Sequence, residues 1–168
     1  MSDYEYMLLA IKEARKAYKN DEVPVGAVIV EKGRIIAKAY NKKEKTKCSI
    51  DHAEIIAIKK ACGKISNWRL TNSSLYVTLE PCPMCASAIK QSRINRVVYL
   101  LENRNANMRK IVNDILLVKD SNKPVDKVKL DIKQFDSKDV EMLSSFFKTK
   151  RHWTNVLFLY FGLYGILF

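Results

Sequence analysis

Two cysteines in this chain have the residue type and spacing of metal ligands. Cys82 and Cys85 lie three residues apart in "EPCPMCASAI", and Pro83 between them suits the first turn of a helix. The start of a helix concentrates unpaired N–H groups and the positive end of the helix dipole. This environment lowers the pKa of a thiol and favours the thiolate, the form that binds zinc. The spacing therefore predicts two zinc-binding thiolates at one helix start.

A histidine and a glutamate earlier in the chain could complete a catalytic centre. His52 and Glu54 stand in "DHAEIIAIKK", and His152 is the only other histidine. One histidine and two cysteines give zinc three protein ligands and leave a fourth position for water, as in catalytic zinc sites. Zinc in such a site lowers the pKa of water towards ~7. Glu54, two residues along the expected helix, would be placed to carry a proton without being a ligand.

Two other interpretations of the cysteine pair are open at this point. A structural zinc site would need a fourth ligand, which Cys48 or Cys62 could supply, and a C-x-x-C pair can also be a redox centre. The redox interpretation requires a thioredoxin-like pattern, which the chain lacks. The combined pattern is more specific than either half, because H-x-E followed by P-C-x-x-C is the established signature of zinc-dependent nucleobase deaminases.

Helical and strand patterns alternate along the chain and indicate the scaffold that would position these residues. We expect an N-terminal helix with a capping box of Ser2 and Glu5, and then two strands joined by a turn at Lys32-Gly33. Residues 41–50 have no periodicity and are expected to form a loop. The remaining expected elements are a helix from His52 to Cys62 that ends at Gly63, a strand over 74–80, a helix from Pro83 to about Ser92, a strand over 96–101, a helix over 107–118, a weak strand over 125–132 and an amphipathic helix over 137–151. This order predicts an α/β fold, a mixed central sheet of about five strands with helices on both faces.

The composition limits the compartment and the partners. The chain has 168 residues, with 30 Lys+Arg against 18 Asp+Glu and a formal net charge of +12. Four cysteines are too few for a disulfide scaffold, and the start "MSDYEYMLLA" lacks the pattern of a secretory signal, so we expect a reducing, cytoplasmic location. The charge predicts attraction to nucleic acid or to an anionic membrane surface, although a lysine-rich composition can also reflect an AT-rich genome.

The segments around these residues resemble those of the bacterial tRNA-specific adenosine deaminases, within the cytidine-deaminase superfamily. The similarity runs from Tyr4 to Val98, more weakly to Arg151, and rests on "EVPVGAVIV", "HAEIIAI", "LYVTLEPCPMCASAI" and "SRINRVVY". The resemblance implies a cytidine-deaminase-like three-layer α/β/α sandwich over residues 1–151 and a homodimer with one Zn²⁺ per subunit. It also implies hydrolytic deamination of the wobble adenosine to inosine in a tRNA anticodon, in that family a tRNA-Arg with an ACG anticodon. The metal ligands would be His52, Cys82 and Cys85, and the catalytic residue would be Glu54.

The resemblance further implies a nucleoside pocket and a surface for the anticodon stem-loop. Asn41 would hydrogen-bond the flipped nucleotide, and the basic segment 42–47 would contact the RNA backbone. The substrate-binding residues would be Val23, Pro24, Val25, Gly26, Ala27, Asn41, Pro81 and Asn103. The RNA-contacting residues would be Phe146, Phe147, Lys148, Lys150 and Arg151, with one of the two phenylalanines expected in the core.

Two segments depart from the family pattern. After the "VVY" strand the family usually has a Gly and an Asp-x-Lys-x-Gly loop, whereas this chain has "LLENRNANMRK", with Asn103 in place of the Asp and Asn105 in place of the Lys. The change removes a negative charge beside a phosphate-rich ligand, so we expect weaker discrimination of RNA against DNA. Residues 152–168 form an apolar tail where the family is polar. This tail could attach shallowly to a membrane, pack against the core or a dimer mate, or be an altered gene end without function.

Two alternative functions are kept beside the main one. The chain could deaminate a free base or nucleoside such as cytosine, cytidine or guanine, which would not need a basic C-terminal helix with paired aromatic residues. It could also be a catalytically impaired zinc-binding or RNA-binding homologue. The intact Glu54 argues against impairment, because a purely structural zinc site has no use for that carboxylate.

Overall fold

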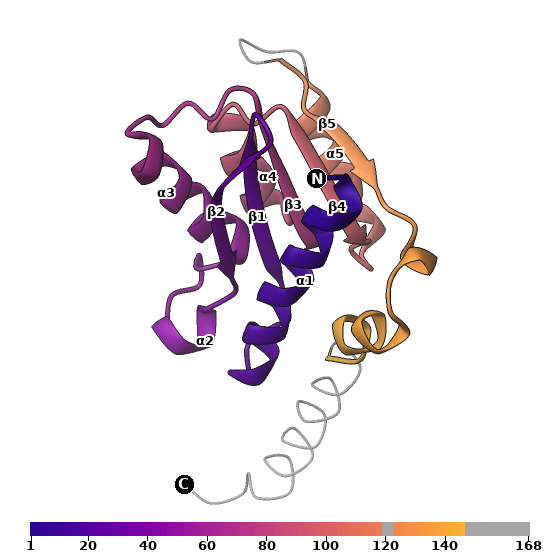
Figure 1. Ribbon diagram of the computed structural model, residues 1–168. Helices are drawn as coiled ribbons and strands as arrows, with labels where there is room; N and C mark the ends of the chain where they lie inside the picture. Colours follow the sequence, from indigo (N-terminus) through magenta and orange to yellow (C-terminus); the bar gives the residue numbers. More distant parts are fainter. Residues whose placement is uncertain (119–122, 147–168) are drawn as a thin grey trace, which may run out of the picture.

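A mixed β-sheet forms the centre of the protein in the computed structural model, which describes residues 1–118 and 123–146. Within these residues the sheet has five strands in the order β2-β1-β3-β4-β5 (Figure 1). β1 pairs antiparallel with β2 and β3, whereas β3, β4 and β5 run parallel. The strands are β1 (Gly26–Glu31), β2 (Arg34–Tyr40), β3 (Ser73–Leu79), β4 (Arg96–Leu101) and β5 (Asp126–Lys129). The expected mixed sheet is confirmed.

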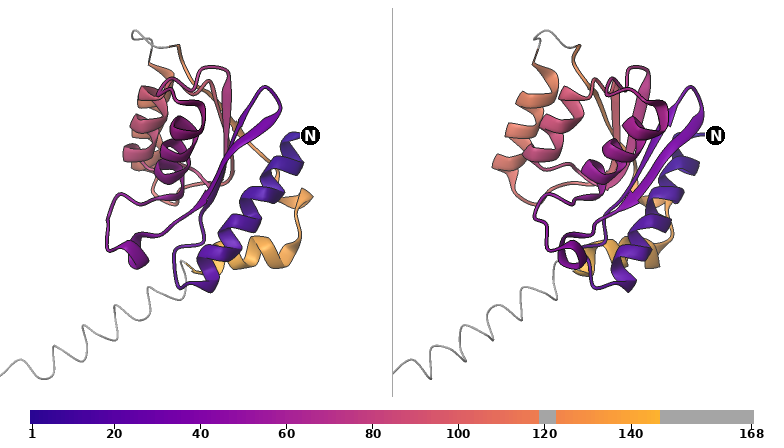
Figure 2. Two further views of the ribbon diagram at one scale, coloured as in Figure 1. Left: turned by 60° about the vertical axis from the view of Figure 1, so that its left-hand side comes forward. Right: turned by 90° about the vertical axis from the view of Figure 1, so that its left-hand side faces the viewer.

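Helices cover both faces of this sheet. α1 (Asp3–Lys19) and the helix over residues 137–146 lie on one face, and α3, α4 and α5 lie on the other (Figure 2). The bounds of the other helices are α2 (Lys43–Thr46), α3 (Ala53–Ile65), α4 (Pro83–Gln91), α5 (Ala106–Leu117) and the 3₁₀ turn η1 (Ile132–Gln134). The predicted three-layer α/β/α sandwich is therefore confirmed, and α4 and α5 are the crossovers that parallel strands require.

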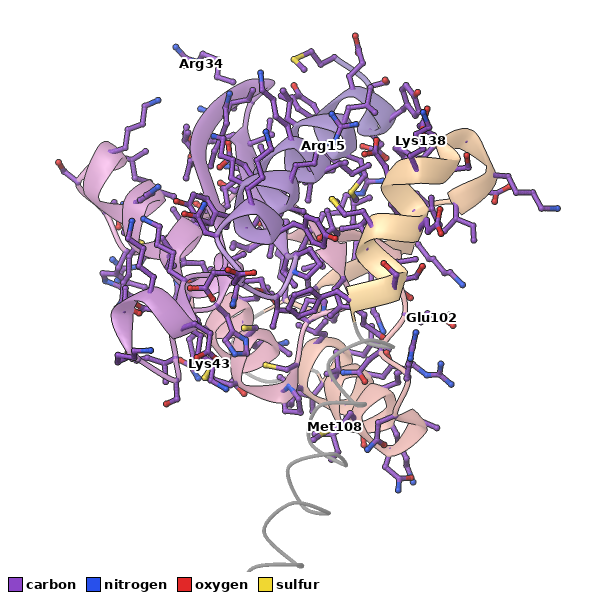
Figure 3. All side chains as sticks on the ribbon, turned by 90° about the horizontal axis from the view of Figure 1, so that it is seen from below. Arg15, Arg34, Lys43, Glu102, Met108 and Lys138 are labelled. Atoms are coloured by element: carbon purple, nitrogen blue, oxygen red, sulfur yellow. The ribbon has the colours of Figure 1, made fainter. Side chains whose placement is uncertain are left out.

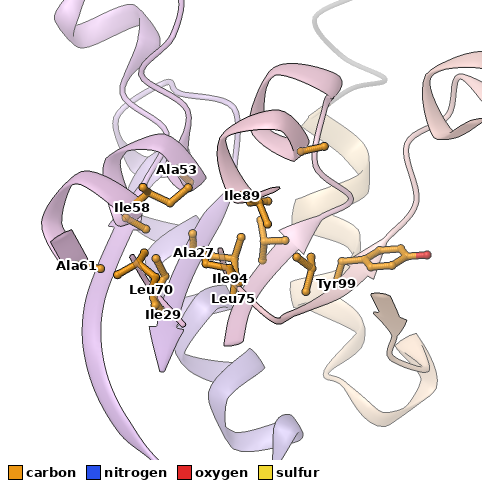
Figure 4. Close-up of a cluster of buried hydrophobic side chains, with 14 of the residues drawn as sticks. Ala27, Ile29, Ala53, Ile58, Ala61, Leu70, Leu75, Ile89, Ile94 and Tyr99 are labelled. Atoms are coloured by element: carbon orange, nitrogen blue, oxygen red, sulfur yellow. The ribbon is translucent and has the colours of Figure 1, made fainter. Parts of the chain in front are cut away.

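The alternation of side chains along β1 explains the two cores. Ala27 and Ile29 face α3 and α4 in the first core (Figure 4), whereas Val28 and Val30 face α1 in the second. Successive residues of a strand point to opposite faces, so a strand that is apolar throughout must be covered on both sides. Leu143 of the helix over residues 137–146 joins the second core. That helix is thereby tied to the sheet face that α1 covers.

The local signals at the N-terminus and in the hairpin are confirmed. Ser2 caps α1, because its Oγ accepts a hydrogen bond from the Glu5 N–H at 3.3 Å and the Glu5 carboxylate accepts one from the Ser2 N–H at 2.6 Å. Lys32 and Gly33 form the turn with φ angles of 47° and 77°. Two positive φ angles in succession are typical of the type I′ turns that join twisted strands.

Two expectations about these elements were wrong: one loop contains a short helix, and one helix ends later than expected. Residues 41–50 contain the short helix α2, which sequence periodicity missed because the Glu22 side chain, distant in sequence, accepts hydrogen bonds from its first N–H groups. The helix α3 does not end at Gly63 but continues to Ile65. Ser66, its C-cap, has the left-handed conformation with a φ angle of 52°. Gly63 has open space around its Cα, so nothing forces the helix to stop there.

Several sequence predictions lie outside the described residues. These are the RNA contacts of Phe147, Lys148, Lys150 and Arg151, the tail 152–168 and its three interpretations, and the domain boundary after residue 151. Among residues 1–118 and 123–146, none of the helices combines the length and the apolar character needed to cross a membrane.

Candidate metal centre and active site

The first residues of two helices bring the expected metal ligands together. His52 is the N-cap of α3 and Cys82 is the N-cap of α4, with Cys85 in the first turn of α4. The Nδ1 atom of His52 lies 3.7 Å from the Cys82 Sγ and 3.5 Å from the Cys85 Sγ. Neither residue caps its helix with a side-chain hydrogen bond, and all three side chains meet at one point. The sequence prediction of one shared site is consistent with this geometry.

The distances suit a zinc ion. Zinc–sulfur bonds of about 2.3 Å and zinc–nitrogen bonds of about 2.0–2.1 Å, at a tetrahedral angle, separate sulfur and nitrogen by about 3.5 Å. The potential ligand atoms of His52, Cys82 and Cys85 all lie within 4.8 Å of one another. Among the described residues neither Cys48 nor Cys62 joins this group, and the Cys62 thiol instead donates to the Trp68 carbonyl. Three protein ligands, with no fourth among residues 1–118 and 123–146, favour a catalytic over a structural zinc site.

The two thiols differ in their ability to ionise. A hydrogen bond from the Cys85 thiol, with a further one from His52, lowers the pKa of Cys82 to about 4. The same contact raises the pKa of Cys85, which is also buried. The pKa of His52 is raised, chiefly by its hydrogen bond to Cys82, while the charge of Lys43 opposes this shift. One thiolate is thus available before metal binds, and binding must displace the proton of the second.

The Glu54 side chain lies beside the ligands and away from solvent. The residue is 4% exposed, and its carboxyl group forms a hydrogen bond with Cys85. Burial raises the pKa of Glu54 above its ordinary value. A carboxyl group with a raised pKa holds and releases a proton closer to neutral pH, as a general acid–base requires. Glu54 is therefore placed for proton transfer next to the ligand triad.

Asn41 and Val23 lie on the side of the site formed by the ends of β1 and β2. The Asn41 N–H donates to the Val25 carbonyl at 3.0 Å, and Lys42 donates in the same way to Asp51, the neighbour of His52. Val23 is half-buried and packs against the first core. This segment therefore adjoins the start of α3.

The other expected pocket residues of this segment are buried, and their contact with a nucleoside stays a prediction. Pro24, Val25, Gly26 and Ala27 are buried, and Ala27 has no exposed surface. A Cβ on Gly26 would lie 2.0 Å from the Ala10 carbonyl oxygen of α1. The glycine is thus needed for close packing against α1.

A buried carboxylate joins the second side of the site to the metal motif. Pro81 is buried just before Cys82, and the preceding Glu80 side chain accepts a hydrogen bond from the Asn103 N–H at 2.9 Å. The Glu80 carboxylate also pairs with Lys127 of β5. The loop that follows β4 is therefore held against the start of α4.

The altered loop after β4 is a regular cap and not a degraded segment. The Asn103 Oδ1 accepts from the Asn105 N–H, and the Asn105 Oδ1 accepts from the N–H groups of Asn107 and Met108 at the start of α5. Asparagine is a favoured N-cap residue, which accounts for Asn105 where the family has Lys.

Basic residues of α2 and an aromatic pair formed by Tyr18 and Phe146 belong to helices that lie on the face of the molecule that Figure 3 shows. Figure 3, seen from below, shows Lys43 of α2 and Glu102 of the loop after β4 on opposite sides of the view. Lys43, Lys45 and Lys47 are exposed. Phe146 is half-buried and its ring meets that of Tyr18 edge-on at 6.4 Å. Phe146 is in neither hydrophobic core cluster of the described residues, so the expectation that one phenylalanine of the pair lies in the core stays a prediction.

Sequence reasoning missed three residues that support the site. Glu22 is fully buried beneath Asn41, Glu80 is buried beside the zinc motif, and Lys127 pairs with Glu80. An acid that ends the apolar run "SLYVTLE" is a signal that could have indicated Glu80. Glu22 and Lys127 have no such signal, because their partners are remote in sequence.

Comparison with known proteins supports the presence of a zinc site. Residues 1–101 match the family model of the cytidine and deoxycytidylate deaminase zinc-binding region. The tRNA-specific adenosine deaminase of Bacillus subtilis is 54% identical over 97 residues, which are 58% of this chain and 60% of that protein. The match thus spans less than two thirds of the Bacillus relative. The tRNA-specific adenosine deaminase of Aquifex aeolicus is 39% identical over 88% of this chain and 96% of that protein.

A solved structure supports the same assignment. A protein from a study of A-to-I editing by tRNA:A34 deaminases at the wobble position of transfer RNA superposes with a TM-score of 0.66. It is 35% identical, and the superposition covers 76% of this chain and 98% of that protein. With its zinc motif matched and its likeness to the Aquifex protein extending over most of both sequences, the chain belongs to the cytidine and deoxycytidylate deaminase family, in its tRNA-specific adenosine deaminase branch.

Proposed function

We propose that this chain deaminates the wobble adenosine of a tRNA anticodon to inosine. The observation that carries the proposal is the His52, Cys82 and Cys85 triad with the buried Glu54 carboxyl group beside it. The tRNA-specific relatives support the choice of substrate class. By family resemblance the expected tRNA is a tRNA-Arg with an ACG anticodon, acted on in the cytoplasm.

The reaction exchanges the C6 amino group of adenine for an oxygen of water. A zinc ion held by His52, Cys82 and Cys85 supplies Lewis acidity and lowers the pKa of water. Glu54 accepts the two protons of the attacking water in turn and passes one to the purine N1 and the other to the departing amino group, so that ammonia leaves. The raised pKa of Glu54 suits both directions of transfer.

The remaining site residues would hold the target nucleotide out of the anticodon stack. Asn41 would hydrogen-bond the nucleoside, Val23 would contact it, and the Asn103 Nδ2 would donate to the ribose or a phosphate. Pro81, buried before Cys82, would shape the floor of the pocket. The wobble base must leave its neighbours to reach C6, and the pocket contacts would offset the cost of unstacking it.

The basic residues near the site would bind the RNA backbone. The exposed Lys43, Lys45 and Lys47 border one side, and the formal net charge of +12 favours a polyanion in general. Phosphate contacts of this kind make affinity fall steeply with salt. Nucleic-acid binding is therefore favoured over genome composition as the reason for the charge.

The proposed active form is a homodimer. The exposed apolar side chains of α5 and its end, Met108, Ile111, Leu117 and Val118, are 40–54% accessible. Figure 3 shows Met108 on the side of the molecule opposite Arg15 of α1. Met108 and Ile111 lie one turn apart on the same side of α5, and exposed apolar side chains of this kind are typical of a surface that a second subunit covers. Ile111→Lys should shift the full-length protein towards monomer in analytical ultracentrifugation, and an unchanged dimer would exclude this face.

A substrate panel tests the proposed function against its alternatives. The zinc-loaded full chain is incubated with an anticodon stem-loop RNA, its DNA analogue, adenosine, cytidine, cytosine and guanine, and ammonia release is measured. The proposal predicts release from the stem-loop, and the Asn103 loop predicts a measurable rate with the DNA analogue. Release from a free base or nucleoside alone would show a different deaminase, and no release at all would show an impaired homologue.

A further inference from the structure

Glu22 is a buried carboxylate that the proposed chemistry does not use. It has no exposed surface and lies between the end of α1 and the segment 23–27. Three N–H donors converge on it, from the Asn41 side chain at 3.0 Å and from the backbones of Glu44 and Lys45 at 3.1 and 2.7 Å. A buried charge persists only when such donors surround it, which points to a function for this position.

The contact with Glu22 determines which way the Asn41 carboxamide faces. A carboxylate has no proton to donate, so it can meet only the Nδ2 end of the amide. Rotating the amide by 180° would bring the Asn41 Oδ1 against the Glu22 Oε2 and replace attraction with repulsion. Asn41 is itself 4% exposed, and its backbone is bonded to Val25, so the whole side chain is held.

The same carboxylate shapes the rim of the pocket. Its two oxygens accept the first N–H groups of α2, the turn that carries the exposed lysines. α2 has no side-chain cap of its own. The Glu22 carboxylate therefore holds both Asn41 and the α2 turn in place. Because Glu22 is fully buried, it does so without touching a bound ligand.

We propose that Glu22 is a positioning residue that holds the Asn41 carboxamide in one of its two orientations. The proposal rests on the proposed function, in which Asn41 contacts the target nucleotide. With one Nδ2 proton given to Glu22, Asn41 presents its second N–H and its Oδ1 to the nucleoside in a fixed arrangement. Asn41 then selects nucleosides whose hydrogen-bond acceptor and donor match its free N–H and its Oδ1. Glu22 determines which position holds the donor and which holds the acceptor.

A double-mutant cycle separates positioning from a general structural role. Glu22→Gln keeps the side-chain volume but lets the amide meet Asn41 through either of its ends. In the native background kcat/KM on the anticodon stem-loop should fall roughly tenfold, the scale of one hydrogen bond to a charged group. In an Asn41→Ala background the same change should cost clearly less than tenfold, because the group it acts through is gone and only the loss of one acceptor for the α2 N–H groups remains. Equal losses in both backgrounds would overturn the proposal.

A matched control uses the other buried glutamate of this region. Glu13 is 6% exposed and pairs with Lys16 on α1, without contact to Asn41. Glu13→Gln should leave kcat/KM within about twofold of the native value, as removal of a single partly solvated ion pair implies. A loss equal to that of Glu22→Gln would show that any buried charge near α1 has this effect, which would overturn the proposal.

A second measurement does not depend on turnover or on the Glu22 variant folding. The side-chain ¹H–¹⁵N resonances of Asn41 are assigned in the native protein by their absence in Asn41→Ala. One of the two Nδ2 protons should exchange with solvent at least tenfold more slowly than those of exposed asparagines. Rapid exchange of both protons would overturn the proposal. If the protein proves inactive on RNA, this result still decides the orientation, so the two failures are distinguishable.

Discussion

The Nδ1 atom of His52 lies 3.5 Å from the Sγ atom of Cys85, although 33 residues separate them. The contact exists because β3 and its flanking loops place the start of α3 beside the start of α4. Each helix alone offers at most two ligands, so the site depends on the tertiary fold. This geometry predicts that zinc binds only when α3 packs against α4, and that bound zinc stabilises this packing.

Zinc content should follow the triad and not the number of cysteines. His52→Ala and Cys85→Ser should each lose most of the bound zinc, because two remaining ligands hold the metal weakly. Cys62→Ser is the matched control, since Cys62 lies outside the triad and donates to the Trp68 carbonyl. Metal analysis of the purified variants measures this. Loss of zinc from Cys62→Ser would mean that the ligand set is assigned wrongly.

The pair Gly26 and Gly63 should respond oppositely to alanine. Gly26→Ala places a Cβ 2.0 Å from the Ala10 carbonyl oxygen and 2.5 Å from the Ala14 nitrogen, both backbone atoms of α1. Overpacking against a backbone should cost more than ~2 kcal/mol of unfolding free energy. Gly63→Ala, inside α3 with open space around it, should stabilise by about 0.5–1 kcal/mol. Urea denaturation checks both, and a neutral Gly26→Ala would contradict the packing described.

Removal of one partner of the buried Glu80–Lys127 ion pair should lower the free energy of unfolding strongly. The two side chains are 1% and 12% exposed, so Lys127→Met leaves a buried carboxylate without its cation and should destabilise by about 3–5 kcal/mol. Lys129→Met breaks the exposed pair with Glu102 and should cost less than about 1 kcal/mol. The combined Glu80→Gln and Lys127→Met change should recover part of the loss. Equal effects of the two lysine variants would show that burial is not the cause.

Asp3 should stabilise the protein less as the solution becomes more acidic. The hydrogen bond from Arg96 holds the pKa of Asp3 below its ordinary value of 3.8. A lowered folded-state pKa means that the stabilisation is complete above the unfolded value and is lost as pH falls through the folded value. The difference in unfolding free energy between native protein and Asp3→Asn should therefore shrink below pH ~4. A difference that stays constant from neutral pH to pH ~3 would refute the linkage.

Local patterns predicted the elements because each signal acts within a few residues. The capping box of Ser2 and Glu5, the turn at Lys32-Gly33 and the proline at the start of α4 are all satisfied by neighbours in sequence. The same locality explains why His52 and Cys82 could be recognised: both are helix N-caps, and their types and flanking residues form a motif.

Remote contacts explain what the sequence did not predict. α2 forms because Glu22 accepts its N–H groups from twenty-two and twenty-three residues away. The burial of Ala27 follows from the covering of β1 on both faces by helices that lie elsewhere in the sequence. Asn105, which stands where the family has Lys, is explained by the cap that it provides for α5.

Conversion of the wobble base tests the central claim most directly. The zinc-loaded full chain is incubated with a tRNA-Arg bearing an ACG anticodon, and inosine is detected by sequencing as guanosine. The native protein should convert the wobble adenosine alone. Glu54→Gln should be slower by about 10²–10⁴-fold at unchanged zinc content, and Glu141→Gln, at an exposed position, should match the native protein. An unchanged wobble base with the zinc-loaded native protein, or full activity of Glu54→Gln, would contradict the account.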